Sequence, residues 1–262
     1  MTLELASVSY RYAGYARPAL RDVSLRVDDG EIVGIVGANE AGKTTLCLVA
    51  SGLAPASIGG RLLSGSVVAD GQDLARIPVH GLAERVAIGF QDPATQLSGA
   101  TGSVIEEVAL GPLNLGMPGR EALERAHEAL DALNIGDLAE RDPLRLSGGQ
   151  GQLVVIAALL AMRPRHLVLD EPTAQLDPHG TRLVADALRR LAAVGTALLI
   201  AEHKTDLLDE LCGRIAVLDG GALVGDGSAA SVLEDPRLVD RGVAPPSRVT
   251  IRRAIEAAGA AP

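Results

Sequence analysis

The N-terminal part of the chain alternates apolar and polar residues, which is the pattern of half-buried strands. Val8, Tyr10 and Tyr12 share one face of a first predicted strand, and residues 20–27 form a second. The run Ile32–Val36 is apolar throughout, as in a parallel strand that is covered on both faces. The chain is therefore expected to begin with short strands and to reach the interior of a sheet by residue 36.

The middle of the chain changes to a helical period. Residues 121–133 place five apolar side chains on one helix face, namely Leu123, Ala126, Ala129, Leu130 and Leu133. Ser147 can cap a helix that runs to Met162, because its hydroxyl can accept a hydrogen bond from the first turn. We therefore predict a helical insertion over residues 101–162.

Strand and helix signals alternate on both sides of this insertion. Helices are predicted over residues 42–53 and from residue 178, and further strands at residues 65–71, 86–90, 167–170 and 196–201. Such alternation implies a mostly parallel sheet with helices on both faces. The predicted fold class is α/β, with an N-terminal antiparallel β subdomain and an inserted α-helical subdomain.

Residues 37–44 match the G-x-x-x-x-G-K-[ST] phosphate loop, between a buried strand and a helix. Backbone N–H groups of such a loop point at phosphates. Lys43 is expected to reach the β- and γ-phosphates of ATP, and Thr44 to ligate Mg²⁺. The core is thus predicted to be a P-loop NTPase. Its predicted nucleotide-binding residues in this region are Gly37, Ala38, Asn39, Glu40, Ala41, Gly42, Lys43, Thr44 and Thr45.

Two carboxylates end the apolar strand at residues 167–170. Asp170 and Glu171 would lie at the carboxyl edge of the sheet, where open α/β folds bind ligands. Asp170 is expected to hold Mg²⁺, and Glu171 to act as general base on the attacking water. An acidic pair at a strand end is common. The pair therefore indicates an ATP site only in combination with the phosphate loop.

A third motif, Leu146-Ser147-Gly148-Gly149-Gln150, lies between the other two and resembles the signature motif of ATP-binding-cassette (ABC) ATPases. The resemblance implies that residues 147–150 contact the γ-phosphate of ATP bound to a second cassette. The physics agrees, since glycines allow close backbone approach and a helix N-terminus favours an anion. Hydrolysis is therefore expected at a composite site shared by two subunits.

The same resemblance assigns further residues by their order in the chain. Gln91 matches the Q-loop glutamine, which senses Mg²⁺ or the water. Asp177 closes a D-loop at residues 174–177, which crosses the dimer interface. His203 matches the switch histidine near the γ-phosphate. Together with Glu171, Gln91 and His203 are the predicted catalytic residues.

An aromatic side chain is expected to stack on adenine. The chain has one Phe, no Trp and three Tyr, and Tyr12 matches the stacking aromatic of the family. Tyr10 is the competing candidate, which would otherwise pack on the sheet.

Two positions depart from the family pattern. Glu40 stands in the phosphate loop where relatives often have glycine, and we expect its carboxylate to point away from the phosphates. Leu153 stands where many relatives carry arginine after the signature motif. Neither change removes a catalytic group.

Composition narrows the class of function. The net charge is −9 with no long basic run, which argues against nucleic acid as a partner. The longest apolar run, residues 153–162, is too short to span a bilayer, so any membrane role is expected to be peripheral. Cys47 and Cys212 lie in apolar contexts and are expected to be buried, reduced thiols.

A finer resemblance, to the energising ATPases of energy-coupling-factor (ECF) transporters, covers most of the chain. It is carried by Phe90-Gln91-Asp92-Pro93, by residues 104–109 and 111–116, and by Ala201-Glu202-His203-Lys204. It implies uptake of a vitamin or a transition-metal ion, with the chain bound peripherally at the cytoplasmic face of the cell membrane. A coupling helix would then dock in a groove beside residues 91–97.

The partners that this resemblance implies are a second ABC ATPase subunit, a transmembrane coupling subunit and a substrate-binding membrane subunit. The ATPase pair can be a homodimer or a heterodimer, since the predicted catalytic residues are all present. Two alternatives stay open. One is the ATPase of a conventional binding-protein-dependent ABC importer, and the other is a soluble ABC ATPase of iron–sulfur cluster assembly.

Residues 1–234 are predicted to form the ATPase domain, and residues 235–262 a tail beyond the catalytic motifs. Pro245-Pro246 stiffens the entry to a short helix whose apolar stripe is Ile251, Ala254, Ile255 and Ala258. A helix this short needs a surface to pack against, either its own domain or the matching tail of a second cassette. The family resemblance favours the second, which makes the tail a dimerisation element.

Overall fold

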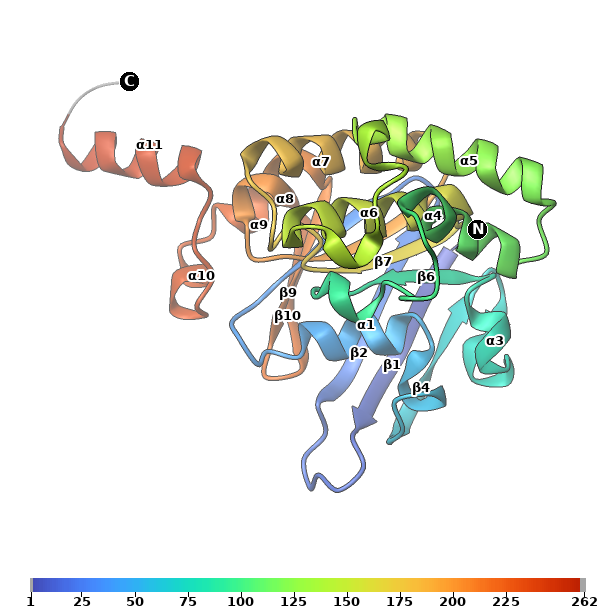
Figure 1. The fold of residues 1–262 in the computed structure, drawn as a ribbon. Helices are drawn as coiled ribbons and strands as arrows, with labels where there is room; N and C mark the ends of the chain where they lie inside the picture. The colour runs from blue at the N-terminus through green and yellow to red at the C-terminus, as the bar shows by residue number, and fades with distance from the viewer. Residues whose placement is uncertain (1, 260–262) are drawn as a thin grey trace.

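The computed structural model describes residues 2–259, and Figure 1 shows its two sheets with the helices around them. An antiparallel sheet has the strand order β2-β1-β4-β5, and a second sheet has the order β10-β9-β3-β8-β7-β6. Strands β9, β3, β8, β7 and β6 are parallel, and β10 pairs antiparallel with β9. The strand bounds are β1 Thr2–Arg11, β2 Leu20–Asp28, β3 Ile32–Val36, β4 Arg61–Ala69, β5 Gln72–Asp73, β6 Val86–Gly89, β7 His166–Asp170, β8 Ala197–Ala201, β9 Arg214–Asp219 and β10 Ala222–Ser228.

Helices cover both faces of the larger sheet, which confirms the predicted fold class. In Figure 1, α4 to α8 lie above this sheet, and α1 lies below it beside the antiparallel sheet. Within residues 2–259, no helix combines the length and the apolarity needed to cross a bilayer. The helix bounds are α1 Lys43–Ala50, α2 Leu53–Ala56, α3 Val79–Leu82, α4 Val104–Asn114, α5 Gly119–Ala132, α6 Gly148–Met162, α7 Pro178–Ala193, α8 Thr205–Leu211, α9 Ala229–Leu233, α10 Arg237–Asp240 and α11 Ser247–Ala257.

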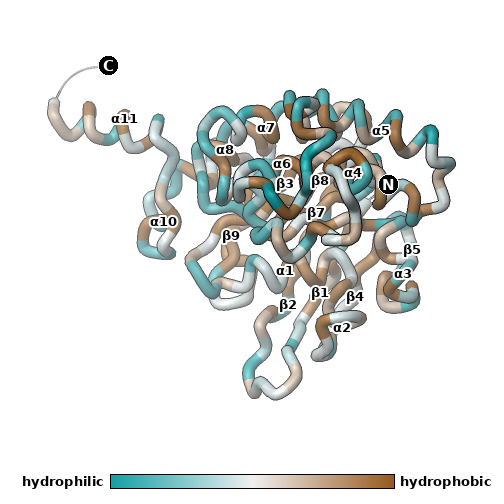
Figure 2. Tube along the Cα trace, viewed as in Figure 1, coloured by the Kyte–Doolittle hydropathy of each residue, from teal (hydrophilic) through white to brown (hydrophobic). Residues whose placement is uncertain are grey.

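The core consists of two apolar clusters, one on each face of the larger sheet. Successive side chains of a strand point to opposite faces, so Leu167 and Leu169 join the cluster under the helices while Val168 joins the cluster around α1. Figure 2 shows the apolar residues concentrated along these central strands. A strand buried on both faces is held firmly, so the loops at its carboxyl end start from fixed points.

Element boundaries differ from the predicted ones where glycines intervene. The predicted helix over residues 42–53 ends at Ala50, because Gly52 adopts a left-handed φ of 78°. The strand predicted at residues 65–71 instead spans Arg61–Ala69. The strand at Ile32–Val36 has the predicted bounds.

The buried face of α5 is rotated from the predicted one. The helix buries Ala122, Ala126, Ala129 and Leu130, whereas Leu123 is 43% exposed. The expectation that Leu123 lies on the buried face was therefore wrong. Small residues at positions 122, 126 and 129 let α5 lie close to its neighbours, and this places the larger Leu123 at the edge of the contact.

The tail leaves the main body only at its end. Leu238 and Val243 are buried in the core, and Val249 at the start of α11 is also buried. Arg248 donates to Asp209 of α8 at 2.7 Å and to Glu234 at 2.7 Å. Beyond this anchor α11 projects away from the sheets (Figure 1). The tail therefore packs on its own domain through its first half, and its second half extends outward.

Both cysteines are buried, as expected from their apolar contexts. Burial raises the pKa of Cys212 to about 12 and holds the pKa of the Cys47 thiol well above its usual range. Both side chains therefore stay protonated near neutral pH.

Candidate active site

A cleft of about 490 Å³ opens at the carboxyl edge of the larger sheet. The loop after β3, the residues after β7 and those after β8 all reach it, as expected for an open α/β sheet. Sequence reasoning missed two parts of this lining. They come from the loop before β2 and from the turn after β9, whose paired glycines were the available signal. The lining residues are Pro18, Ala19, Asn39, Glu40, Gly42, Lys43, Thr44, Thr45, Glu171, His203, Gly220 and Gly221.

The loop after β3 folds around the amino group of Lys43. The side chain is 6% exposed, and its Nζ donates to the carbonyl oxygens of Gly37 at 3.0 Å and Ala38 at 3.1 Å. Burial lowers the pKa of the Lys43 ammonium, while the nearby carboxylates of Glu171 and Asp170 oppose this shift. A cation confined at the start of α1 is suited to bind an anionic ligand.

Two residues of this loop have left-handed backbones. Gly42 precedes α1 at φ 105°, a conformation that L side chains rarely adopt. Glu40 has φ 64° and is exposed. Holding a non-glycine residue there costs about 1 kcal/mol or more. The Glu40 side chain is thus solvated, at the rim of the cleft that it helps to line.

Asp170 has the features of a ligand for a divalent cation. It is 4% exposed, and its Oδ1 atom is buried with no hydrogen-bond partner among the described residues. Burial raises the pKa of its carboxyl, and a hydrogen bond from Thr44 opposes this shift. Mg²⁺ prefers hard oxygen ligands, and a cation at Oδ1 would satisfy this buried atom. The residues present therefore fit the predicted Mg²⁺ site.

Glu171 is held from both sides. His203 Nε2 lies 2.9 Å from its Oε1 atom, and Gln91 Nε2 donates to its Oε2 atom at 2.8 Å. Its backbone N–H donates to the carbonyl of Ala201 on β8 at 2.8 Å, and its φ of 50° turns the chain sharply after β7. The fold thus brings together the three residues predicted to be catalytic. A carboxylate so oriented can accept a proton from a nearby water.

Gln91 is positioned by a second glutamine. Gln96 accepts a hydrogen bond from Phe90 N at 2.9 Å and donates to Ile88 O at 2.8 Å. These contacts give hydrogen-bond partners to two backbone groups, Ile88 O and Phe90 N, along β6, which is an edge strand of the sheet. The loop that carries Gln91 is thereby fixed to the strand before it. Gln91 contacts Glu171 and not Asp170, so its predicted role as a metal ligand stays a prediction.

The two candidate tyrosines occupy different environments. Tyr10 is fully buried, and its hydroxyl donates to the carbonyl of Gly59. Tyr12 is half-buried, packs edge-to-face against Tyr15, and has its hydroxyl 3.1 Å from Thr45 Oγ1 on α1. Only Tyr12 therefore offers surface to a base, and its contact with Thr45 places it near the phosphate loop.

The signature motif lies outside this cleft. Ser147 caps α6 as predicted, in a reciprocal pair of hydrogen bonds with Gln150. Ser147 and Gly148 are exposed, and Gly149 and Gln150 are half-buried. Asp177 is also exposed, and its side chain caps α7 by accepting from Gly180 N at 2.7 Å. These residues line no part of the cleft in their own subunit.

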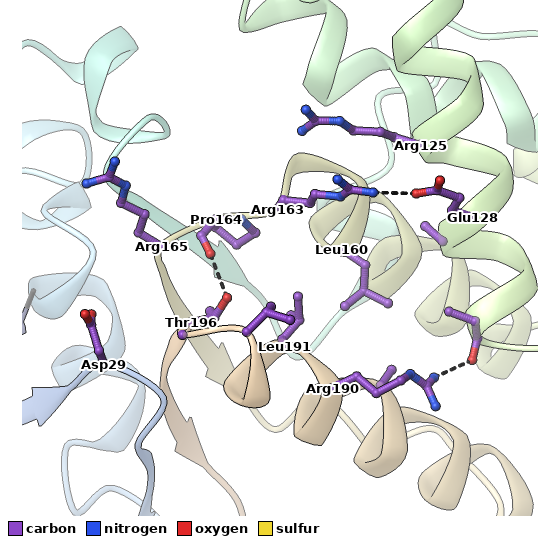
Figure 3. A pocket seen from close by; sticks show the side chains of 15 residues that line it. Asp29, Arg125, Glu128, Leu160, Arg163, Pro164, Arg165, Arg190, Leu191 and Thr196 are labelled. Carbon is purple, nitrogen blue, oxygen red and sulfur yellow. Dashed lines mark hydrogen bonds and ion pairs between the residues drawn. The ribbon is translucent and has the colours of Figure 1, made fainter.

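A larger cavity, of about 880 Å³, lies beside the first residues of β7 and β8, at the other edge of the sheet (Figure 3). Arginines rim it, but Arg163 pairs with Glu128 at 2.5 Å and Arg190 donates to the carbonyl of Ala132 at 2.9 Å. Arg190 thereby stabilises the C-terminus of α5, whose carbonyls carry partial negative charge, and Arg163 is neutralised by Glu128. We therefore place the chemistry in the smaller cleft.

Comparison with known proteins agrees with this geometry. Residues 20–174 match the family model described as ABC transporter. The cobalt import ATP-binding protein CbiO of Rhodobacter capsulatus is 40% identical over 245 residues, which cover 93% of this chain and 85% of that protein. The energy-coupling factor transporter ATP-binding protein EcfA of Methanothermobacter thermautotrophicus is 37% identical over 242 residues, with coverages of 91% and 75%.

A solved structure shares the fold as well. It is cbiO1 of Clostridium perfringens, described as part of the ABC transporter complex cbiONQ, with a TM-score of 0.75 and 30% identity. The alignment covers 91% of this chain and 92% of that one. Fold, cleft and sequence similarity point to one conclusion. The chain belongs to the ABC transporter family and is an ATPase subunit of such a transporter.

Proposed function

We propose that this chain binds Mg-ATP and hydrolyses it to energise uptake of a vitamin or a transition-metal ion through an ECF-type membrane transporter. The observation that carries the proposal is that the predicted ATP-site residues lie on two separate surfaces of the chain. Lys43, Glu171 and His203 line one cleft, whereas the signature motif lies outside that cleft on the same chain. The ECF assignment is supported by the relatives named CbiO and EcfA.

The split site requires a second cassette. The signature residues 147–150 begin a helix whose free N–H groups favour an anion. A two-fold pair of cassettes would place these groups of each subunit over the phosphates held by Lys43 of the other. The second subunit can be another copy of this chain or a related one.

Within the closed pair, each side chain has a distinct task. Lys43 would bind the β- and γ-phosphates, and Tyr12 would stack on adenine. Thr44 and Asp170 would hold Mg²⁺, which supplies positive charge at the phosphates. Glu171 would take the proton of the attacking water, with His203 and Gln91 holding its two oxygens in place.

The surface after β6 is the proposed contact with the transmembrane coupling subunit. Glu107 on α4 is buried, and it accepts hydrogen bonds from Ser98 N, Ser98 Oγ and Thr101 Oγ1, each at 2.6 Å. The loop of residues 97–101 is therefore fixed. Next to it Leu144 is 71% exposed and lies 4.0 Å from where a side chain on Gly99 would begin. An exposed leucine on a fixed surface is suited to receive a helix.

We expect Leu144→Glu to uncouple transport from hydrolysis. The charge should weaken docking, so uptake by the assembled transporter should fall by roughly tenfold or more. ATP hydrolysis by the isolated chain should stay within about twofold, because Leu144 does not line the cleft. Val194→Glu is the matched control, since Val194 is 81% exposed and lines the larger cavity at the other edge of the sheet. Normal uptake by the Leu144 variant would place the docking surface elsewhere.

The outer half of α11 is the proposed contact between tails. Ile251 is 59% exposed and Ile255 is 42% exposed, while Val249 anchors the helix on its own domain. Arg252 and Arg248 hold the pKa of Glu234 down to about 2, so this charged anchor persists at neutral pH. The apolar stripe is thus presented outward on a fixed helix, where a second tail can cover it.

Ile251→Lys combined with Ile255→Lys should shift the nucleotide-free protein from dimer to monomer. Two charges inside an apolar contact are strongly unfavourable. Light scattering of the ATP-free protein measures the change, with Glu256→Lys as the control on the polar side of α11. Point changes are preferable to truncation of the whole tail, because truncation would also remove the buried Val243. A dimer that persists in the double variant would show that the stripe has another use.

Purification from membranes tests the main proposal. The tagged chain is expressed with its natural membrane partners, extracted in detergent, and its bound subunits are identified by mass spectrometry. We expect a transmembrane coupling subunit and a small substrate-binding membrane protein. Co-purification with a soluble scaffold or with a conventional permease, and without these two proteins, would overturn the ECF assignment.

A further inference from the structure

Three consecutive residues after β8 connect the catalytic cleft to the D-loop. His203 reaches Glu171 in the cleft. Its neighbour Glu202 turns inward, is 2% exposed, and accepts hydrogen bonds from Thr173 Oγ1 at 2.7 Å and His203 N at 2.8 Å. Thr173 directly precedes the D-loop. The backbone of the switch histidine and the start of the D-loop are therefore joined through one buried carboxylate.

Lys204 holds the D-loop from the same side. Its Nζ atom donates to the carbonyl of Thr173 at 2.6 Å and to the carbonyl of Leu176 at 3.3 Å. The two carbonyls bracket the exposed turn at Ala174 and Gln175. A full charge on backbone carbonyls makes stronger hydrogen bonds than a neutral donor does. Lys204 is one of only two lysines in the chain, and the other is Lys43.

The opposite side of the D-loop rests on the signature motif of the same subunit. A Cβ atom at Gly148 would lie 2.2 Å from Gln175 Oε1, and one at Gly149 would lie 3.3 Å from Gln175 O. A side chain at position 148 would therefore displace the Gln175 amide from its place against α6. The D-loop is thus held between Lys204 and the start of α6.

We propose that Lys204 is a positioning residue that fixes the D-loop between the switch histidine and the signature glycines. On the two-cassette function proposed above, His203 serves the ATP of its own subunit and residues 147–150 serve the ATP of the partner. Lys204 then links the geometry of one ATP site to that of the other. The link runs through the side chains of Lys204 and Glu202, neither of which is assigned a contact with the nucleotide.

Lys204→Met removes the donors and keeps the length of the side chain. In the ATP-free chain, hydrogen–deuterium exchange of the Ala174 and Leu176 amides should accelerate roughly fivefold or more. Their N–H groups donate within the turn, to Glu171 O and Thr173 O, and Lys204 also donates to Thr173 O and fixes the turn there. Lys204→Arg retains donors for both carbonyls and should restore most of the protection. Exchange that matches the wild type in the Met variant would overturn the proposal.

A second set of measurements tests how Lys204 affects hydrolysis and dimerisation of the two cassettes. Lys204→Met should lower kcat roughly tenfold or more, because small misplacements are costly in a composite site. The Kd for ATP should stay within about twofold, and in the Glu171→Gln background the ATP-dependent dimer should be lost. Arg120→Met is the matched control, since Arg120 lies on the exposed surface of α5. Unchanged kcat and an intact ATP-dependent dimer would also overturn the proposal.

The two measurements separate this inference from the function on which it rests. Failure of Glu171→Gln alone to dimerise with ATP would count against the two-cassette function, while the exchange experiment still decides the role of Lys204. If Lys204→Met does not fold, Lys204→Gln keeps one donor nitrogen and replaces it. The same exchange, kcat and dimerisation results then decide the proposal. Thermal unfolding of each variant establishes which case applies.

Discussion

Replacing Glu171 by glutamine is expected to lower ATP turnover by about 100-fold or more while ATP still binds. The amide keeps the size of the side chain and can still contact Gln91 and His203. It cannot accept the proton of the attacking water, and proton transfer of this kind contributes roughly 10²- to 10⁴-fold to rates. Phosphate release under saturating ATP measures kcat, and calorimetry measures the Kd for ATP.

The trapped nucleotide in this variant should also favour the closed pair of cassettes, which appears as an ATP-dependent increase in mass. Glu124→Gln is a suitable control, because Glu124 lies on the surface of α5, where it pairs with the exposed Arg120. If the Glu171 variant turned over ATP at the wild-type rate, the general base would have to be another group, with His203 the nearest.

Lys43→Ala should weaken ATP binding by about 100-fold or more. The ammonium donates to two carbonyls of its own loop and is buried among them, so it is already oriented for a phosphate. Its removal also leaves the neighbouring carboxylates of Asp170 and Glu171 without a compensating charge, so the cleft would repel the triphosphate. Calorimetric titration with ATP measures the loss, and Arg120→Ala controls for the loss of one surface cation. Retention of wild-type affinity would remove Lys43 from the phosphate site.

Much of the fold and of the cleft follows from local sequence. The strand Ile32–Val36, the phosphate loop after it and the Ser147 cap of α6 each depend on neighbouring residues, and each lies where the sequence places it. Parallel strands bring their carboxyl ends to one edge. This rule brings Gln91, Glu171 and His203 together although they are far apart in the chain.

What local sequence leaves undetermined depends on packing between distant elements. The burial of Tyr10 in preference to Tyr12 is set by contacts with residues about fifty positions away, as at Gly59. The edge position of Leu123 is set by how closely α5 approaches its neighbours. The contacts of Lys204 with the D-loop join the ends of two adjacent strands, and no spacing motif reports them. These are tertiary effects that a helical or strand period does not encode.

The two buried thiols make the chain convenient for site-specific labelling. Alkylating reagents attack the thiolate, and burial keeps both Cys47 and Cys212 protonated and shielded. A single cysteine introduced on the surface should therefore react selectively, without removal of the native ones. A spin label or fluorophore at Ala258 could then report when the tails separate, with the core unaltered.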